Sequence, residues 1–334
     1  MELKRILVPT DFSTYARAAL EQALDLALRY DAEICLLHVS TLHGDDPNHP
    51  DAQFPEIQAM LERMEERAAE SMAELKKELG ERGAGLRTCC VRAVSAAPAI
   101  TEFVRREEMD LVVMGTHGRR GLRRCLMGSV AEEVLRTVQV PVLTTRLVER
   151  DAGWRRILVP YDFSDGADQA LATAVDLARR HGAEIDLVHV VMPPVMPAGI
   201  TGAGVVGSVG ADLKKDLQEL LHARASDAAL RSGVFVQPYV LEGAVDFSIT
   251  ELARLKATDL IVMGSHGLSG FWRFLLGSVT EKVVRSAPCP VWVRRLEAAA
   301  PTTETPSIET PIAETAGGEN GIKESLAAFH ALSA

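Results

Sequence analysis

Short apolar runs alternate with longer amphipathic stretches along this chain, and the alternation predicts an α/β fold. The first apolar run covers residues 3–9, and in the following stretch Ala16, Leu20 and Leu24 recur at helical spacing. Strands that alternate with helices in this way form a parallel sheet with helices on both faces. In the first half we predict strands at 3–9, 33–40, 86–94, 110–115 and 141–147, and helices at 13–30, 56–82, 98–108 and 128–137.

The second half of the chain repeats this pattern. The sequence RILVPTDFS at 5–13 returns as RILVPYDFS at 156–164, and DLVVMG at 110–115 returns as DLIVMG at 259–264. The offset stays between 149 and 151 residues, so one domain has been duplicated. We predict two tandem doubly wound domains, each a five-stranded parallel sheet of strand order 3-2-1-4-5. The predicted domains cover residues 1–148 and 154–296, and an acidic Pro/Thr/Glu-rich tail covers residues 297–334.

Charge and composition narrow the class of protein. The net charge is −10, and the tail alone contributes half of it, with six glutamates and one lysine. Neither repeat has the basic excess of a nucleic-acid binder. No apolar run approaches the length of about 20 residues that spans a bilayer. Because an apolar strand begins at once, we expect no signal peptide. We expect a cytoplasmic protein.

The five cysteines are Cys35, Cys89, Cys90, Cys125 and Cys289. They form no C-x-x-C pair and do not correspond between the repeats, as expected of reduced thiols that serve mainly in packing. Adjacent Cys89 and Cys90 are compatible with redox sensitivity, but neighbours in a strand point to opposite faces of the sheet.

A glycine-spaced motif occurs once in each repeat. Residues 115–129 read GTHGRRGLRRCLMGS and residues 264–278 read GSHGLSGFWRFLLGS, so both have the form G-x2-G-x9-G-S. Glycines and a hydroxyl that follow an apolar strand and open a helix suit a backbone that surrounds phosphate groups. The alternative is a tight strand–helix connection, which duplication would copy passively.

A carboxylate follows the first strand of each repeat. If the strand order reverses between the first and fourth strands, Asp11 faces Gly115 across one cleft, and Asp162 faces Gly264 across another. A carboxylate there can accept hydrogen bonds from an adenine amino group or a ribose hydroxyl. The backbone of Val39 or Val190, at the end of the second strand, can contact the base. Because no G-x4-G-K-[ST] motif is present, no P-loop lysine reaches the phosphates.

The two repeats differ outside these motifs. The first glycine loop contains four arginines at 119, 120, 123 and 124, whereas the second contains Leu268, Phe271, Trp272 and one arginine at 273. We therefore expect the first repeat to attract polyphosphate more strongly. His117 and His266 are expected to fix their loops through hydrogen bonds.

Two segments outside the motifs have no settled role. The stretch 192–210 is apolar and glycine-rich, compatible with a lid, a contact surface or a flexible connection. Residues 322–333 have helical spacing and either dock as a helix or stay disordered.

These motifs resemble those of the universal stress protein family, in the tandem form with two UspA-type domains. The resemblance rests on P-x-D-F-S, the strand-ending His-Val, V-M-G-[ST]-H-G and G-x2-G-x9-G-[ST], and covers about 1–147 and 154–295. It implies the ATP-binding branch of the family and pairing of the last strands, 141–147 with 290–295, within one chain. Further association of two chains stays open. The residues it implies for nucleotide binding are Pro9, Asp11, Val39, Gly115, Gly118, Gly128, Ser129 and Val130 in site one, and Pro160, Asp162, Val190, Gly264, Gly267, Gly277, Ser278 and Val279 in site two.

The sequence thus predicts a stress-response regulator that binds ATP or a related adenine nucleotide with Mg²⁺. Three alternatives stay open. A weak ATPase or autophosphorylating protein would use a loop hydroxyl such as Ser129. A carrier of hydrophobic ligands would use 192–210, and a nucleotide-independent scaffold would use the tail. No catalytic residue and no protein metal ligand is predicted.

Overall fold

The computed structural model describes residues 1–41, 55–83, 85–116, 127–147, 153–193, 210–266 and 276–295. In the first half the elements are β1 (Arg5–Pro9), α1 (Thr14–Tyr30), β2 (Glu33–Thr41), α2 (Pro55–Leu79), a 3-10 helix (Gly80–Gly83), β3 (Leu86–Ala93), α3 (Ala96–Arg106), β4 (Leu111–Gly115), α4 (Ser129–Thr137) and β5 (Val142–Thr145). In the second half they are β6 (Arg156–Pro160), α5 (Asp165–His181), β7 (Glu184–Val191), α6 (Ala211–Ser232), β8 (Val236–Glu242), α7 (Val245–Leu255), β9 (Leu260–Gly264), α8 (Ser278–Ser286) and β10 (Val291–Arg294).

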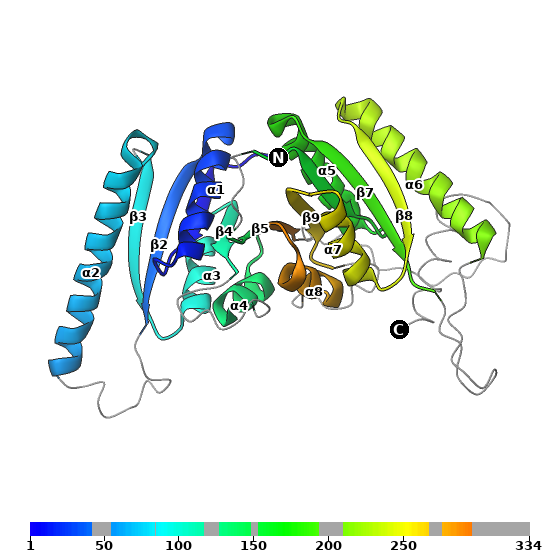
Figure 1. Ribbon diagram of the computed structural model, residues 1–334. Coiled ribbons are helices and arrows are strands. Elements are labelled where there is room, and N and C mark those ends of the chain that lie inside the picture. The colour runs from blue at the N-terminus through cyan, green and yellow to red at the C-terminus, as the bar shows by residue number, and fades with distance from the viewer. Residues whose placement is uncertain are drawn as a thin grey trace, which may run out of the picture.

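All strands belong to one sheet, of order β3-β2-β1-β4-β5-β10-β9-β6-β7-β8 (Figure 1). Each half has the predicted order 3-2-1-4-5, and pairing within each half is parallel. The predicted helix at 56–82 ends at Leu79, where Gly80 has φ +54° and the chain tightens into the 3-10 helix.

The halves join through their last strands. β5 and β10 are antiparallel, with Leu143 opposite Trp292, and both side chains are fully buried. The resemblance implied this pairing. It removes the edge that each half would otherwise expose at its last strand.

Helices cover both faces of the continuous sheet. One core packs against α1, α2, α5 and α6, and the other packs against α3, α4, α7 and α8. Each core contains residues from both halves, so the apolar layers continue across the junction. Among the described residues, no helix combines the length and apolar character needed to cross a membrane.

Candidate functional site

The exit of β1 is a tight turn built around Asp11. The Asp11 Oδ1 atom accepts a hydrogen bond from the Ser13 N–H at 3.0 Å, and the Ser13 hydroxyl accepts one from the Ala16 N–H at 3.2 Å, which caps α1. Phe12, between them, has φ +62°. Because left-handed backbone is unfavourable for a bulky residue, this turn is held by its surroundings. The turn places the Asp11 carboxylate at the carboxyl edge of the sheet.

The exit of β6 repeats this geometry. Asp162 Oδ1 accepts hydrogen bonds from the N–H and the hydroxyl of Ser164, at 3.1 and 2.5 Å, and Ser164 caps α5. Phe163 has φ +64°. The duplicated P-x-D-F-S sequence therefore encodes a duplicated backbone turn, with the carboxylate in the same role.

Two histidines, one in β2 and one in β7, stabilise these turns by hydrogen bonds. The Nδ1 atom of His38 lies 2.8 Å from the carbonyl oxygen of Thr10, and that of His189 lies 2.8 Å from the carbonyl oxygen of Tyr161. Since a carbonyl only accepts, Nδ1 carries the proton in both. The imidazoles also contact Phe12 and Phe163, with ring centroids 4.9 and 5.1 Å apart. The role of these histidines was not predicted, although each lies 28 residues after the residue whose carbonyl it contacts, which was the available signal.

The glycines at the ends of β4 and β9 act by letting a helix approach. A Cβ atom on Gly115 would lie 2.8 Å from the Cβ atom of Tyr15, in α1. One on Gly264 would lie 3.1 Å from the carbonyl oxygen of Gly166, in α5. The space that a side chain at Gly115 would need is filled by α1, so this glycine brings the end of β4 against the helix that follows Asp11. The predicted role of Gly115 in letting the backbone approach a ligand stays a prediction.

The helix that ends each glycine loop begins without a side-chain cap. Gly128 and Gly277 are the N-cap residues of α4 and α8, and their N–H groups donate to the carbonyl oxygens of Thr116 and Ser265 at 2.8 Å. These bonds hold each helix start against the end of its strand. The first-turn N–H groups of an α-helix have no partner within the helix. Serine follows each cap, and Ser129 and Ser278 are exposed.

These elements meet at one edge of the sheet in each half. The turn at Asp11 and the start of α4 lie at the carboxyl ends of β1 and β4, and the turn at Asp162 and the start of α8 lie at the ends of β6 and β9. Val130 is 37% exposed at the helix start. Two of the predicted site residues, Gly118 and Gly267, lie outside the described residues, as do His117 and the loop arginines.

The two sites differ in how closely their strand ends are covered. Val39 is half-buried, whereas Val190 is 6% exposed. Thr10, before Asp11, and Tyr161, before Asp162, are both buried, but the Tyr161 hydroxyl also contacts Asp168 and Arg224. Burial, together with the positive charge of Arg295, lowers the pKa of His266 at the start of the second loop. Among the described residues, the end of the second strand is therefore more deeply buried in site two than in site one.

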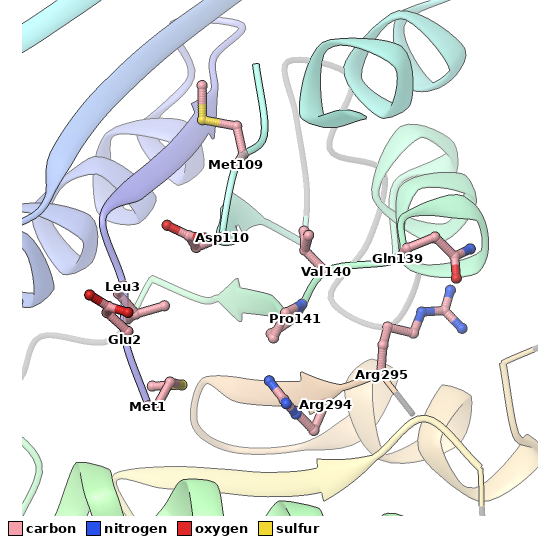
Figure 2. Close-up of a pocket in the computed structure, with 10 residues that line it drawn as sticks. All are labelled: Met1, Glu2, Leu3, Met109, Asp110, Gln139, Val140, Pro141, Arg294 and Arg295. Atoms are coloured by element: carbon pink, nitrogen blue, oxygen red, sulfur yellow. The ribbon is translucent and has the colours of Figure 1, made fainter. Parts of the chain in front are cut away.

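A cavity of about 300 Å³ lies away from these residues, at the junction of the halves (Figure 2). Its lining comes from the amino ends of strands of the first half, from Arg294 at the end of β10 and from Arg295 after it. The Asp110 carboxylate accepts hydrogen bonds from the Lys4 and Arg5 N–H groups, both at 2.8 Å. The cavity wall thus carries both charge signs and holds none of the predicted site residues.

Comparison with known proteins agrees with this architecture. The profile of the universal stress protein family matches residues 2–146 and again residues 153–295. A universal stress protein of Mycobacterium bovis is 30% identical over 285 residues, covering 83% of this chain and 92% of the relative. One from Methanocaldococcus jannaschii is 37% identical over 141 residues, covering 42% of this chain and 81% of the relative.

A solved structure has the same tandem extent. The universal stress protein of Archaeoglobus fulgidus superposes with a TM-score of 0.63 at 24% identity, and covers 88% of this chain and 99% of its own. At this identity the likeness supports the fold alone. With the family profile matching both halves, the chain belongs to the universal stress protein family, in its tandem form.

Proposed function

We propose that each half of the chain binds an adenine nucleotide, ATP with Mg²⁺, and that the protein acts in the cytoplasm as a nucleotide-dependent regulator of the stress response. One observation carries the proposal. In both halves an aspartate-centred turn and a helix start without a side-chain cap meet at the same edge of the sheet. In open α/β sheets this edge is where ligands bind.

The phosphates are assigned to the helix starts. The N–H groups of the first turn and the positive end of the helix dipole favour an anion, and the cap glycine leaves them uncovered. The residues proposed to hold phosphate are Gly128, Ser129 and Val130 in site one, and Gly277, Ser278 and Val279 in site two, together with Gly118 and Gly267.

The base and the ribose are assigned to the other side of the cleft. Asp11 or Asp162 would accept hydrogen bonds from the adenine amino group or a ribose hydroxyl. Val39 and Val190, with Pro9 and Pro160, would contact the nucleoside. Gly115 and Gly264 act indirectly, since they let the helix after the aspartate turn lie against the end of the strand.

Magnesium enters this proposal with the nucleotide. Among the described residues, no three His, Cys, Asp or Glu side chains cluster as metal ligands. Mg²⁺ usually keeps several waters and is held through substrate phosphates with one or two carboxylates. We therefore expect Mg²⁺ to bind with ATP and not in advance of it.

The experiment is nucleotide binding by the full chain with substitutions at the helix starts. Proline at the first helical residue removes one N–H but is compatible with helix geometry. The preceding glycines have ψ near 140°, which suits a following proline. We expect Ser129→Pro to abolish binding at site one and Ser278→Pro to abolish it at site two, measured by calorimetry and by the nucleotide released on denaturation. Each variant is the control for the other site, and circular dichroism checks its fold.

A second pair of variants tests the nucleoside side. Asp11→Asn and Asp162→Asn keep an oxygen to accept from the serine N–H but replace the other carboxylate oxygen with an amide donor. We expect each to weaken binding at its own site by at least about tenfold, or about 1.4 kcal/mol. If the unsubstituted protein releases no nucleotide and binds no added Mg-ATP, the proposal is wrong.

The two proline variants also compare the ATP affinities of site one and site two. Four arginines in the first glycine loop favour tighter binding of ATP at site one than at site two. The variant Ser278→Pro leaves site one to be measured alone, and Ser129→Pro leaves site two. Equal affinities would contradict this part of the proposal.

A further inference from the structure

Two cysteine thiols lie in contact between β2 and β3. The Sγ atoms of Cys35 and Cys89 are 3.6 Å apart. Cys89 pairs in register with Leu37, two residues beyond Cys35, so both thiols are on the same face of the sheet. This is the face that α3 covers. Cys90 points to the opposite face, where its Sγ atom lies 4.0 Å from the Met72 Sδ atom of α2, which confirms the predicted alternation.

The two thiols differ in access. Cys35 is 4% exposed, whereas Cys89 is half-buried. Burial, reinforced by Cys89, raises the pKa of Cys35 to about 12, so Cys35 is a neutral thiol at physiological pH. A dissolved oxidant therefore meets Cys89 first, with Cys35 directly behind it.

An arginine accompanies the pair. Arg87 lies opposite Cys35 in the register of β2 and β3, and its charge favours the thiolate form of Cys35. Arg87 is held in place by an ion pair with Glu107 and lies 6.0 Å above the ring of Phe103 in α3. A cation beside a thiol stabilises the thiolate, which is the form that reacts with oxidants.

The second half lacks this arrangement. In the matching register, Asp186 stands in place of Cys35, Gln237 in place of Arg87 and Tyr239 in place of Cys89. The thiol pair is therefore not part of the duplicated framework.

We propose that Cys35 and Cys89 form a reversible disulfide when the protein meets a hydroperoxide, which makes this pair a modification site separate from both nucleotide sites. The Cys89 thiolate attacks the terminal peroxide oxygen, the O–O bond breaks and the departing oxygen leaves as water or alcohol after taking a proton. Cys89 is then a sulfenic acid. The Cys35 sulfur loses its proton and attacks the Cys89 sulfur, the S–O bond breaks and that oxygen leaves as water. Two thiols are oxidised by two electrons and one peroxide is reduced.

The geometry favours a bond that is readily reduced. A disulfide has an S–S distance of about 2.05 Å, so the sulfur atoms must approach by about 1.5 Å. Among the described strands, β3 is at the edge of the sheet and pairs with β2 alone, so it can shift without disturbing another of them. Because Cys89 is half-buried, a reductant can reach this disulfide, and exposed disulfides are more readily reduced than structural ones.

The test uses the full-length reduced protein treated with an equimolar amount of hydrogen peroxide. We expect the free thiols to fall from five to three per chain, the intact mass to fall by about 2 Da as two hydrogens leave, and digestion to yield a peptide that links Cys35 to Cys89. Dithiothreitol is expected to restore all five thiols. Oxidation of Cys89 to sulfinic acid without a cross-link, or a cross-link that involves Cys90, would overturn the proposal.

Four variants make the assignment specific. The linked peptide should be absent from both Cys35→Ala and Cys89→Ser, and Cys90→Ser should form it as the parent does. In Cys35→Ala, Cys89 should instead accumulate as sulfenic acid, detectable with dimedone, which also shows that the variant still presents Cys89. Arg87→Gln, which copies the second half, is expected to slow cross-linking severalfold. An unchanged rate in Arg87→Gln would overturn the assigned role of this arginine.

Discussion

At the same position of the second strand, the first half of the chain has the thiol of Cys35 and the second half has the carboxylate of Asp186. Both side chains are buried, with exposures of 4% and 1%. Cys35 contacts another thiol, whereas Asp186 lies 3.2 Å from the guanidinium of Arg156. The aspartate turns and helix starts at the carboxyl ends of the strands are nevertheless the same in both halves. The comparison teaches that the turn and the helix start were retained together while the interior chemistry diverged.

The largest expected effect comes from removing the partner of the buried carboxylate. We expect Arg156→Ala to lower the free energy of unfolding by about 3–5 kcal/mol, because Asp186 would be left buried without its cation. The equivalent arginine of the first half, Arg5, pairs instead with Glu108, and both side chains are largely exposed, so Arg5→Ala should cost less than about 1 kcal/mol. Urea unfolding of both variants measures the difference, and equal losses would contradict this account.

The pH dependence of the stability of Arg156→Ala gives a second comparison with Arg5→Ala. Burial raises the pKa of Asp186, although Arg156 opposes the shift. A raised carboxyl pKa in the folded state favours folding at low pH, and this contribution is lost as the pH rises through the folded pKa. Removing Arg156 raises the pKa further. The loss of unfolding free energy in Arg156→Ala should therefore shrink as the pH falls from 7 towards 4, whereas the loss in Arg5→Ala should stay below about 1 kcal/mol throughout.

The glycines at the ends of β4 and β9 provide the next test. A Cβ atom on Gly115 would lie within 2.9 Å of both the backbone and the Cβ atom of Tyr15, whereas one on Gly264 would lie no closer than 3.1 Å to any atom. We expect Gly115→Ala to destabilise the protein by about 2–3 kcal/mol and Gly264→Ala by about 1 kcal/mol. Thermal and urea unfolding measure both. A reversed order would mean that α1 shifts more easily than α5.

The helix ends at the junction give a pH-dependent test. His181, at the end of α5, accepts a hydrogen bond from the Trp154 N–H at 3.4 Å and stacks on that indole. Burial, together with Arg29, lowers its pKa to about 4. A lowered histidine pKa contributes stability above its unfolded value, and this is lost as the pH falls from about 6.5 to about 4. We expect up to about 3 kcal/mol of stability to disappear over this range.

Two variants isolate the effect of His181. His181→Asn keeps an acceptor for the Trp154 N–H but does not titrate, so its stability should fall less steeply between pH 6.5 and 4 than that of the parent. The matching residue of the first half, Tyr30, donates a hydrogen bond to Asp176 at 2.5 Å. Tyr30→Phe is the control, and should lower stability without flattening the pH profile. If the stability of His181→Asn falls with pH as steeply as that of the parent, a group other than His181 is responsible for the pH dependence.

The smallest effects are expected where the halves are alike. Arg136 of α4 pairs with Glu281 at 3.2 Å, and Arg285 of α8 pairs with Glu132 at 2.9 Å. These half-exposed pairs contribute little individually, so Arg136→Ala and Arg285→Ala should each cost about 1 kcal/mol or less. A double-mutant cycle measures their coupling. If the two single variants lose very different amounts of unfolding free energy, the two ion pairs are not equivalent, although their contacts are alike.

Much of the fold could be predicted because its determinants are local. The apolar periodicity at 13–30 predicted a helix that is observed at Thr14–Tyr30, and the repeated motifs predicted two copies of one topology. Asp11 and Gly115 could be assigned to the same edge because parallel strands place their carboxyl ends together. Less could be said about Gly115, because a glycine in a sequence does not reveal whether a ligand or a helix will occupy the space beside it.

The sequence by itself determined the repeat, the order of strands and helices, and the presence of an aspartate turn and a glycine-started helix in each half. Those features depend on periodicity, turn chemistry and spacing, which are properties of neighbouring residues. Only the tertiary structure decided that Tyr15 fills the space beside Gly115, that His38 locks the turn before Asp11, and that Cys35 touches Cys89. Each of these contacts joins residues far apart in the chain, and the packing of strands and helices sets their distances.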